Sequence, residues 1–61
     1  MRRRDLLCDL GRHGCEMLRG GSKHTVDINR QARTVSTIPR HREIEKVLVK
    51  KICQDLEIPE P

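Results

Sequence analysis

The sequence predicts an α+β fold in the order helix, three antiparallel strands, helix, with both helices on one face of the sheet. Apolar residues recur at helical spacing near each end of the chain, and β-branched runs occupy the middle. Glycine, asparagine and proline separate these segments. With 61 residues and no Phe, Tyr or Trp, residues 1–61 are expected to form one domain with a thin aliphatic core.

The two helices are predicted from leucine and isoleucine spacing. The first covers Arg4–Arg12, where Leu6, Leu7 and Leu10 share one face, and Gly14 is the residue expected to end it. The second has apolar residues every four positions, namely Ile44, Leu48, Ile52 and Leu56. It is expected to end before Pro59, since proline disfavours helix in the residue before it.

Three strands are predicted between the helices. Cys15–Arg19 is read as a strand mainly because the turn Gly20-Gly21-Ser22 follows it. Lys23–Ile28 is the clearest strand, with His24, Val26 and Ile28 on one side and Lys23, Thr25 and Asp27 on the other. The polar turn Asn29–Ala32 separates it from Thr34–Ile38, which Pro39 should stop. Neighbouring strands joined by short turns should pair antiparallel.

Charge and hydropathy limit the classes of partner. The formal net charge is +4, and residues 1–42 hold ten of the thirteen Lys and Arg against four of the nine acidic residues. A basic front half suits a polyanion such as nucleic acid, although a merely solvated basic surface fits the charge equally well. No apolar run approaches the roughly 20 residues of a membrane span, and no secretory signal is recognisable. We therefore expect a cytoplasmic protein without a membrane partner.

The three cysteines do not predict a disulfide framework or a zinc site. Cys8, Cys15 and Cys53 are an odd number without a CxxC pair, which favours free thiols in a reducing compartment. A zinc site would combine these cysteines with His13 or His24, but the spacing of these residues matches no common pattern of zinc ligands. No metal and no other cofactor is therefore expected.

Three histidines could carry acid or base chemistry, and their positions distinguish them. His24 follows the glycine turn and Lys23, so a substrate phosphate could approach the backbone beside an imidazole that titrates near neutral pH. The alternative is an ordinary histidine at a sheet edge. His13 lies near a helix end, where it can cap carbonyl groups. His41 lies between Arg40 and Arg42, where phosphate contact and plain solvation are equally compatible with the sequence. The terminal run Arg2-Arg3-Arg4 should only tune affinity for phosphates.

Three segments resemble one protein family. They are the strings GCEMLRGGSKHT at 14–25, IPRHREI at 38–44 and KICQDLEIP at 51–59. Together they are similar to the HicA family of bacterial mRNA interferase toxins, over nearly the whole chain from about Asp5 to Pro59. The resemblance implies a fold like that of double-stranded-RNA-binding domains, with the order αβββα. It also implies cleavage of messenger RNA. Metal independence is predicted from the residues themselves, because no convincing ligand cluster is present and attack by the ribose 2′-hydroxyl group needs only proton transfer and charge stabilisation.

The same resemblance implies roles for particular residues. It makes His24 the catalytic residue, although many members read Gly-Ser-His where Lys23 here separates Ser22 from His24. The residues expected to contact RNA are Arg19, Gly20, Gly21, Ser22, Lys23, Arg40 and Arg42. The implied protein partner is a HicB-type antitoxin encoded by the adjacent gene, which should cover the catalytic site.

Two other functions remain compatible with the sequence. A non-catalytic RNA-binding module of the same fold would use the basic surface for phosphates and 2′-hydroxyl groups. A small adaptor for a protein or DNA partner would use the same charges, but no helix-turn-helix pattern supports DNA reading, because three strands separate the helices.

Overall fold

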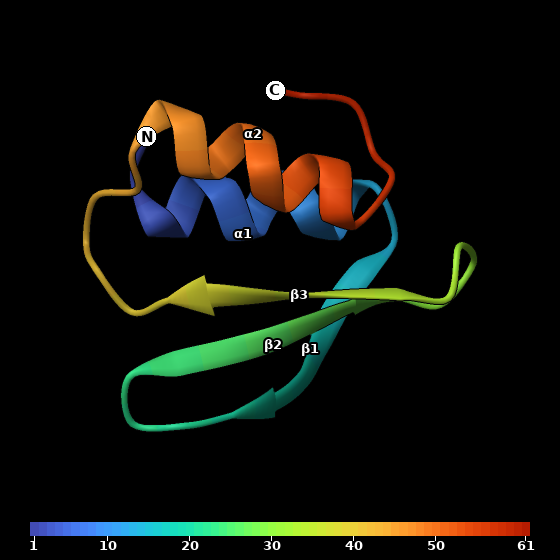
Figure 1. Ribbon diagram of the computed structural model, residues 1–61, viewed down its shortest axis with the longest axis horizontal. Helices are drawn as coiled ribbons and strands as arrows, with labels where there is room; N and C mark the ends of the chain where they lie inside the picture. The colour runs from blue at the N-terminus through green and yellow to red at the C-terminus, as the bar shows by residue number, and fades with distance from the viewer.

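The computed structural model describes residues 1–61 and has the expected element order (Figure 1). The elements are α1 (Arg3–Arg12), β1 (Cys15–Gly20), β2 (His24–Asn29), β3 (Thr34–Pro39) and α2 (Lys46–Asp55). The strands form one antiparallel sheet in the order β1-β2-β3, and Figure 1 shows both helices on the same face of it. The α+β prediction is confirmed, and the boundaries lie within two residues of their expected positions except the end of α2, which stops at Asp55 rather than at the residue before Pro59.

The two helices end and begin for identifiable reasons. Gly14 follows α1 with a φ of +81°, a left-handed conformation that favours glycine, as expected from its position. The sequence predicts that the second helix begins at Ile44, but α2 begins at Lys46. The Ile44 amide donates to the Met1 carbonyl at 2.7 Å, which keeps this segment extended. Neither helix is long and apolar enough to cross a membrane.

The apolar core is supplied mainly by the helices. Its buried members are Leu6, Leu10, Cys15, Ile38, Ile44, Val49, Ile52, Cys53 and Leu56. The outer strands β1 and β3 each provide one of these residues and the central strand β2 provides none. Because buried apolar area is the main source of stability, the fold depends chiefly on contacts made by α1 and α2.

The strand register brings the start of β2 next to the end of β3. His24 pairs with Pro39, and the β2–β3 ladder then runs without interruption to Asn29 and Thr34. The β1–β2 ladder shifts between Met17 and Arg19, which is a β-bulge in an edge strand. His24 therefore lies at the end of the sheet from which the loop to α2 departs.

Candidate active site

A tight turn places His24 at the start of β2. The Gly21 amide donates to the His24 carbonyl at 2.8 Å, which closes the turn. A Cβ atom on residue 21 would lie 3.1 Å from that same carbonyl oxygen, tighter than most side chains tolerate. Glycine therefore avoids a tight contact at this position, and the turn leaves the His24 side chain exposed.

Arg40 fixes this turn from the neighbouring loop. Its Nη1 donates to the Gly21 carbonyl at 3.1 Å, and its backbone amide donates to the Lys23 carbonyl, also at 3.1 Å. The sequence predicts an RNA contact for Arg40, whereas the structure gives it a structural role at the turn. The guanidinium has five N–H donors, so others stay available to a phosphate.

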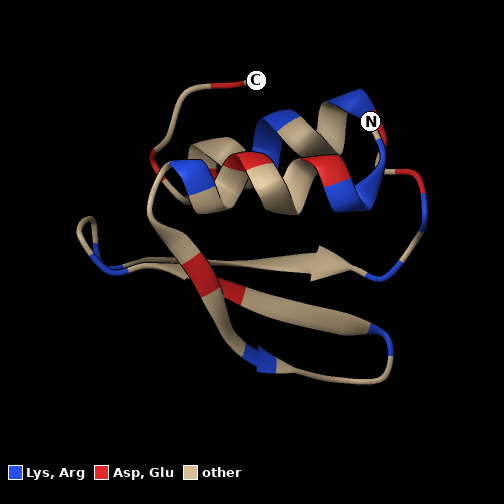
Figure 2. Cartoon of the chain, turned by 180° about the vertical axis from the view of Figure 1, so that it is seen from behind, with Lys and Arg blue, Asp and Glu red and all other residues tan.

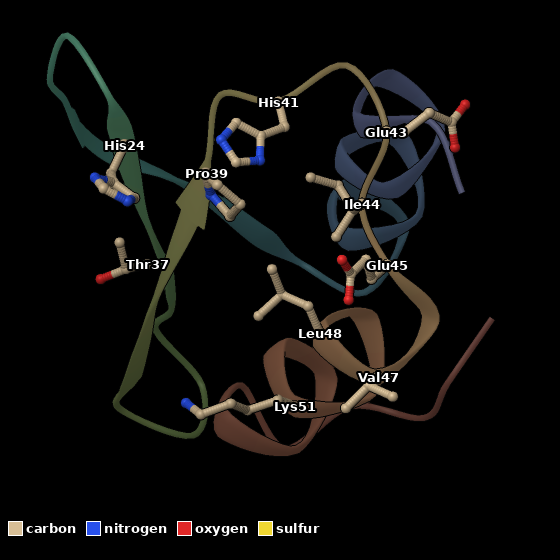
Figure 3. Close-up of a pocket in the computed structure, with 10 residues that line it drawn as sticks. All are labelled: His24, Thr37, Pro39, His41, Glu43, Ile44, Glu45, Val47, Leu48 and Lys51. Atoms are coloured by element: carbon tan, nitrogen blue, oxygen red, sulfur yellow. The ribbon is translucent and has the colours of Figure 1, made fainter.

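The largest cavity of the molecule, of about 560 Å³, lies beside His24. Its ten lining residues are His24, Thr37, Pro39, His41, Glu43, Ile44, Glu45, Val47, Leu48 and Lys51 (Figure 3). We name it the two-histidine cavity, because β2 supplies His24 and the loop after β3 supplies His41. In Figure 3 the two imidazoles lie on either side of Pro39.

The walls of the two-histidine cavity differ in character. Ile44, Val47 and Leu48 provide an aliphatic wall from the start of α2 and the segment before it. Lys51 adds a cation, and its ammonium group donates to Asp55 at 3.0 Å. This hydrogen bond is the main reason why the pKa of the Asp55 carboxyl lies below its usual value. The cavity thus combines two imidazole rings, one cation, the two carboxylates of Glu43 and Glu45, and an apolar surface. The rings and the apolar surface suit a nucleotide base.

The other residues expected to bind RNA surround the cavity rather than line it. Ser22 and Lys23 belong to the turn beside His24 and are exposed, as are Arg19 and Gly20 at the end of β1. Arg42 instead lines a separate cavity of about 180 Å³ with Arg2, Arg3 and Arg4. Figure 2 shows basic residues gathered at the turn after β1, in the loop after β3 and at the start of α1. These positions lie at one end of the molecule.

Arg3 connects α1 to β2 and β3 beside His24. Its Nε donates to the Pro39 carbonyl at 3.0 Å and its Nη2 donates to Thr25 Oγ1 at 3.1 Å. Pro39 is the register partner of His24, and Thr25 is its neighbour in β2. One partly buried side chain from the helix layer therefore fixes the relative position of the two strands at the site.

The remaining histidine and the cysteines lie elsewhere. His13 Nδ1 is 3.0 Å from the Asp9 carbonyl at the end of α1, in agreement with the capping role considered for it. All three cysteines are free, and burial raises the pKa of the Cys15 and Cys53 thiols. No group of three or more His, Cys, Asp or Glu side chains is arranged to hold a metal ion.

Sequence reasoning selected His24 but did not assign a site role to His41, Thr37 or Lys51. The only local signal for His41 was its position in the basic loop Arg40–Arg42. Thr37 and Lys51 give no local signal, because they reach the cavity only when α2 packs beside β3.

Comparison with known families identifies the chain. A family model described as the HicA toxin of bacterial toxin-antitoxin matches residues 3–58. Comparisons with curated proteins and with solved structures gave no match. The match covers all five helices and strands, from the first residue of α1 to beyond the end of α2. The chain therefore belongs to the HicA family of toxins from bacterial toxin–antitoxin systems, which implies an antitoxin partner.

Proposed function

We propose that this chain is a metal-independent endoribonuclease, an mRNA interferase that cleaves messenger RNA and so stops translation. The observation that carries the proposal is the presence of two imidazoles, His24 and His41, on one cavity of nucleotide size. Bacterial messenger RNA is cytoplasmic, so the proposal locates the chain there. The partner in this proposal is a HicB-type antitoxin that covers His24.

The proposed reaction is an internal transfer at phosphorus. The ribose 2′-oxygen attacks the adjacent phosphate, a new P–O2′ bond forms, and the P–O5′ bond breaks. One imidazole accepts the proton of the 2′-hydroxyl group, while the other, protonated, donates a proton to the departing O5′. The products are a 2′,3′-cyclic phosphate and a free 5′-hydroxyl group. Attacking and leaving oxygens lie on opposite sides of phosphorus, so two proton carriers facing one cavity suit this reaction better than one.

Cations near the two histidines support the same proposal. Lys23 precedes His24 in the exposed turn, and Lys51 lines the cavity. Either ammonium group can stabilise the negative charge that develops on the phosphate oxygens. Arg42 and Arg19, further from the cavity, can contact neighbouring phosphates and supply affinity that does not depend on sequence. These assignments need no metal ion.

The first experiment measures cleavage of a synthetic RNA by wild type, His24→Ala and His41→Ala in a buffer that contains EDTA. His13→Ala is the matched control, because His13 is a histidine outside the cavity. We expect His24→Ala to lose about 10²- to 10⁴-fold in rate, and His41→Ala to lose a comparable factor, since each removes one proton-transfer group. His13→Ala should cleave at nearly the wild-type rate.

A second measurement separates the acid from the base. In an RNA with a 5′-bridging sulfur, the leaving group is a thiolate, which departs without protonation. This substrate should restore cleavage in the variant that lacks the acid and not in the variant that lacks the base. Full activity of His24→Ala would contradict the proposal. RNA binding without cleavage by the wild-type chain would favour the non-catalytic RNA-binding module. Loss of cleavage in EDTA, restored by Mg²⁺ or Zn²⁺, would contradict metal independence.

A further inference from the structure

The central strand directs its apolar side chains away from the helices. Along β2, Thr25, Asp27 and Asn29 are buried against the helix layer, while Val26 and Ile28 lie on the opposite face and are only half-buried. A two-layer domain ordinarily turns the apolar side of a strand toward its own helices. The usual arrangement is therefore inverted in this strand.

The neighbouring strand continues this apolar surface. Ile28 pairs with Val35 of β3, and the Val35 side chain is 52% exposed. Val26 pairs with Thr37, which is also exposed. We name Val26, Ile28 and Val35 the open-face patch. Figure 1 shows no helix on this side of the sheet, so nothing within the chain covers it.

The open-face patch is continuous with the candidate active site. Side chains alternate along a strand, so His24 shares the face of β2 that carries Val26 and Ile28. Thr37, the partner of Val26, lines the two-histidine cavity. A molecule seated on the open-face patch therefore reaches the cavity at His24 and Thr37, the part of its lining that the strands supply, while the opposite wall belongs to α2 and the segment before it.

The chemistry of the open-face patch favours a protein as its occupant. Sheets that bind single-stranded RNA on an open face stack bases mainly on Phe, Tyr or Trp, and this chain has none of the three, so His24 is the one ring on this face of β2. A second copy of the chain would bring another net charge of +4 against the same rim, where Arg19 lies opposite Val26 and Glu16, opposite Ile28, is ion-paired with Arg30. An aliphatic centre with a basic rim fits a partner with an apolar centre and acidic surroundings.

We infer that the antitoxin docks on the open-face patch and, from there, closes the two-histidine cavity. Its contact surface would place aliphatic side chains on Val26, Ile28 and Val35 and carboxylates near Arg19 and Lys23. This docking mode rests on the proposed function: an antitoxin on the open-face patch would inhibit RNA cleavage because the patch and His24 lie on the same face of β2. RNA would enter from the basic end of the molecule and compete with the antitoxin at the cavity and at Arg19 and Lys23, the two cations that both partners would contact.

The test measures binding of the antitoxin encoded beside the gene for this chain, by calorimetry, to the wild type and two variants of equal net charge. Val35→Glu places a carboxylate in the open-face patch, and Gln54→Glu places one on the exposed side of α2. We expect Val35→Glu to raise the dissociation constant at least about tenfold, since it puts an unpaired charge into the buried centre of an interface. Gln54→Glu should stay within about twofold of wild type, as expected at an interface rim or outside it.

RNA cleavage by each free variant is measured in parallel. Both should cleave RNA as wild type does, because neither residue lines the cavity. Equal antitoxin binding by Val35→Glu and wild type would overturn the inference, and so would weaker RNA binding by Val35→Glu without a change in antitoxin binding. If Val35→Glu fails to fold, Val35→Thr replaces it and should weaken the complex by a smaller factor. Loss of antitoxin binding in a chain whose wild type does not cleave RNA would support the docking face and reject the nuclease.

Discussion

The two faces of the sheet differ in polarity, and the central strand turns its polar side chains toward the helices and its apolar side chains away from them. The face under the helices carries four buried polar residues, namely Thr25, Asp27, Asn29 and Ser36. The open face carries Val26, Ile28 and Val35, all at least partly accessible. The helices thus contact the central strand through polar residues, while Ile38 of β3 packs in the core and the aliphatic side chains of Val26, Ile28 and Val35 lie on the open face.

Most of the polar contacts under the helices are specific hydrogen bonds. Asn29 Nδ2 donates to the Leu56 carbonyl at 2.7 Å, and Ser36 Oγ donates to Asp55 at 3.2 Å. Together with the bond from Arg3 to Thr25, they connect each helix to the sheet at defined points. Hydrogen bonds are directional and apolar contacts are not, so these contacts specify how the helices sit on the sheet more than how stable the domain is.

The largest difference between the two faces should appear on truncation of aliphatic residues. Leu10 is fully buried in the helix layer, so Leu10→Ala should destabilise the domain by about 2–5 kcal/mol. Val35→Ala on the open face should stay within about 0.5 kcal/mol of wild type, as surface substitutions usually do. Urea unfolding followed by circular dichroism measures both. Equal destabilisation would mean that the open face contributes to the core.

A smaller effect is expected from loss of a polar contact. Asn29 is 6% exposed, and Asn29→Ala leaves the Leu56 carbonyl at the end of α2 without its side-chain donor. The expected cost is about 1–3 kcal/mol, the penalty for an unsatisfied buried group. Gln31→Ala, in the exposed turn that follows, is the control and should be nearly neutral. If both variants unfold at the same urea concentration as wild type, the polar contacts do not hold the helices.

The smallest effect should depend on pH. Asp27 is 4% exposed, and burial raises the pKa of its carboxyl although the nearby Arg3 charge opposes the shift. Its Oδ1 has no hydrogen-bond partner. Because the pKa is higher in the folded state, the protonated form favours folding, and this contribution is lost as pH rises from the ordinary value of 3.8 through the folded value.

Asp27→Asn removes this ionisation. The variant should melt at a higher temperature than wild type at pH 7, and the difference should shrink as pH falls below about 4, where the unfolded carboxyl is also protonated. Thermal unfolding at a series of pH values measures the difference, with Asp5→Asn on the exposed side of α1 as the control. A difference that is the same at all pH values would show that the ionised Asp27 is not the cause.

Local sequence patterns were sufficient to predict the order of the elements. The period-four spacing from Ile44 to Leu56 and the glycine after α1 each depend on neighbours within a few residues. They were not sufficient to predict which face of β2 packs against the helices. The alternation in Lys23–Ile28 separates two sets of side chains, but alternation does not say which set the helices cover. That depends on Arg3 and Asn29, whose hydrogen-bond partners are more than 20 positions away.

The same limit applies to the candidate site. The glycine turn and His24 were predicted because they are adjacent in the sequence. His41 reaches the cavity because Pro39 pairs with His24, and Lys51 reaches it because α2 packs beside β3. The bond from Arg40 to Gly21 joins residues 19 positions apart and could not be inferred from the basic loop alone.

Arg3 has a consequence for the genetics of such a toxin. Its side chain and amide reach Thr25, Pro39 and Arg42, and so connect the first turn of α1 to both strands and to the loop at the site. Mutations that inactivate such a toxin are therefore not confined to the strands and the loop at the candidate site. A substitution at Arg3 removes the side-chain bonds to Thr25 and Pro39 together, so we expect the helix layer to contain positions at which the site is lost.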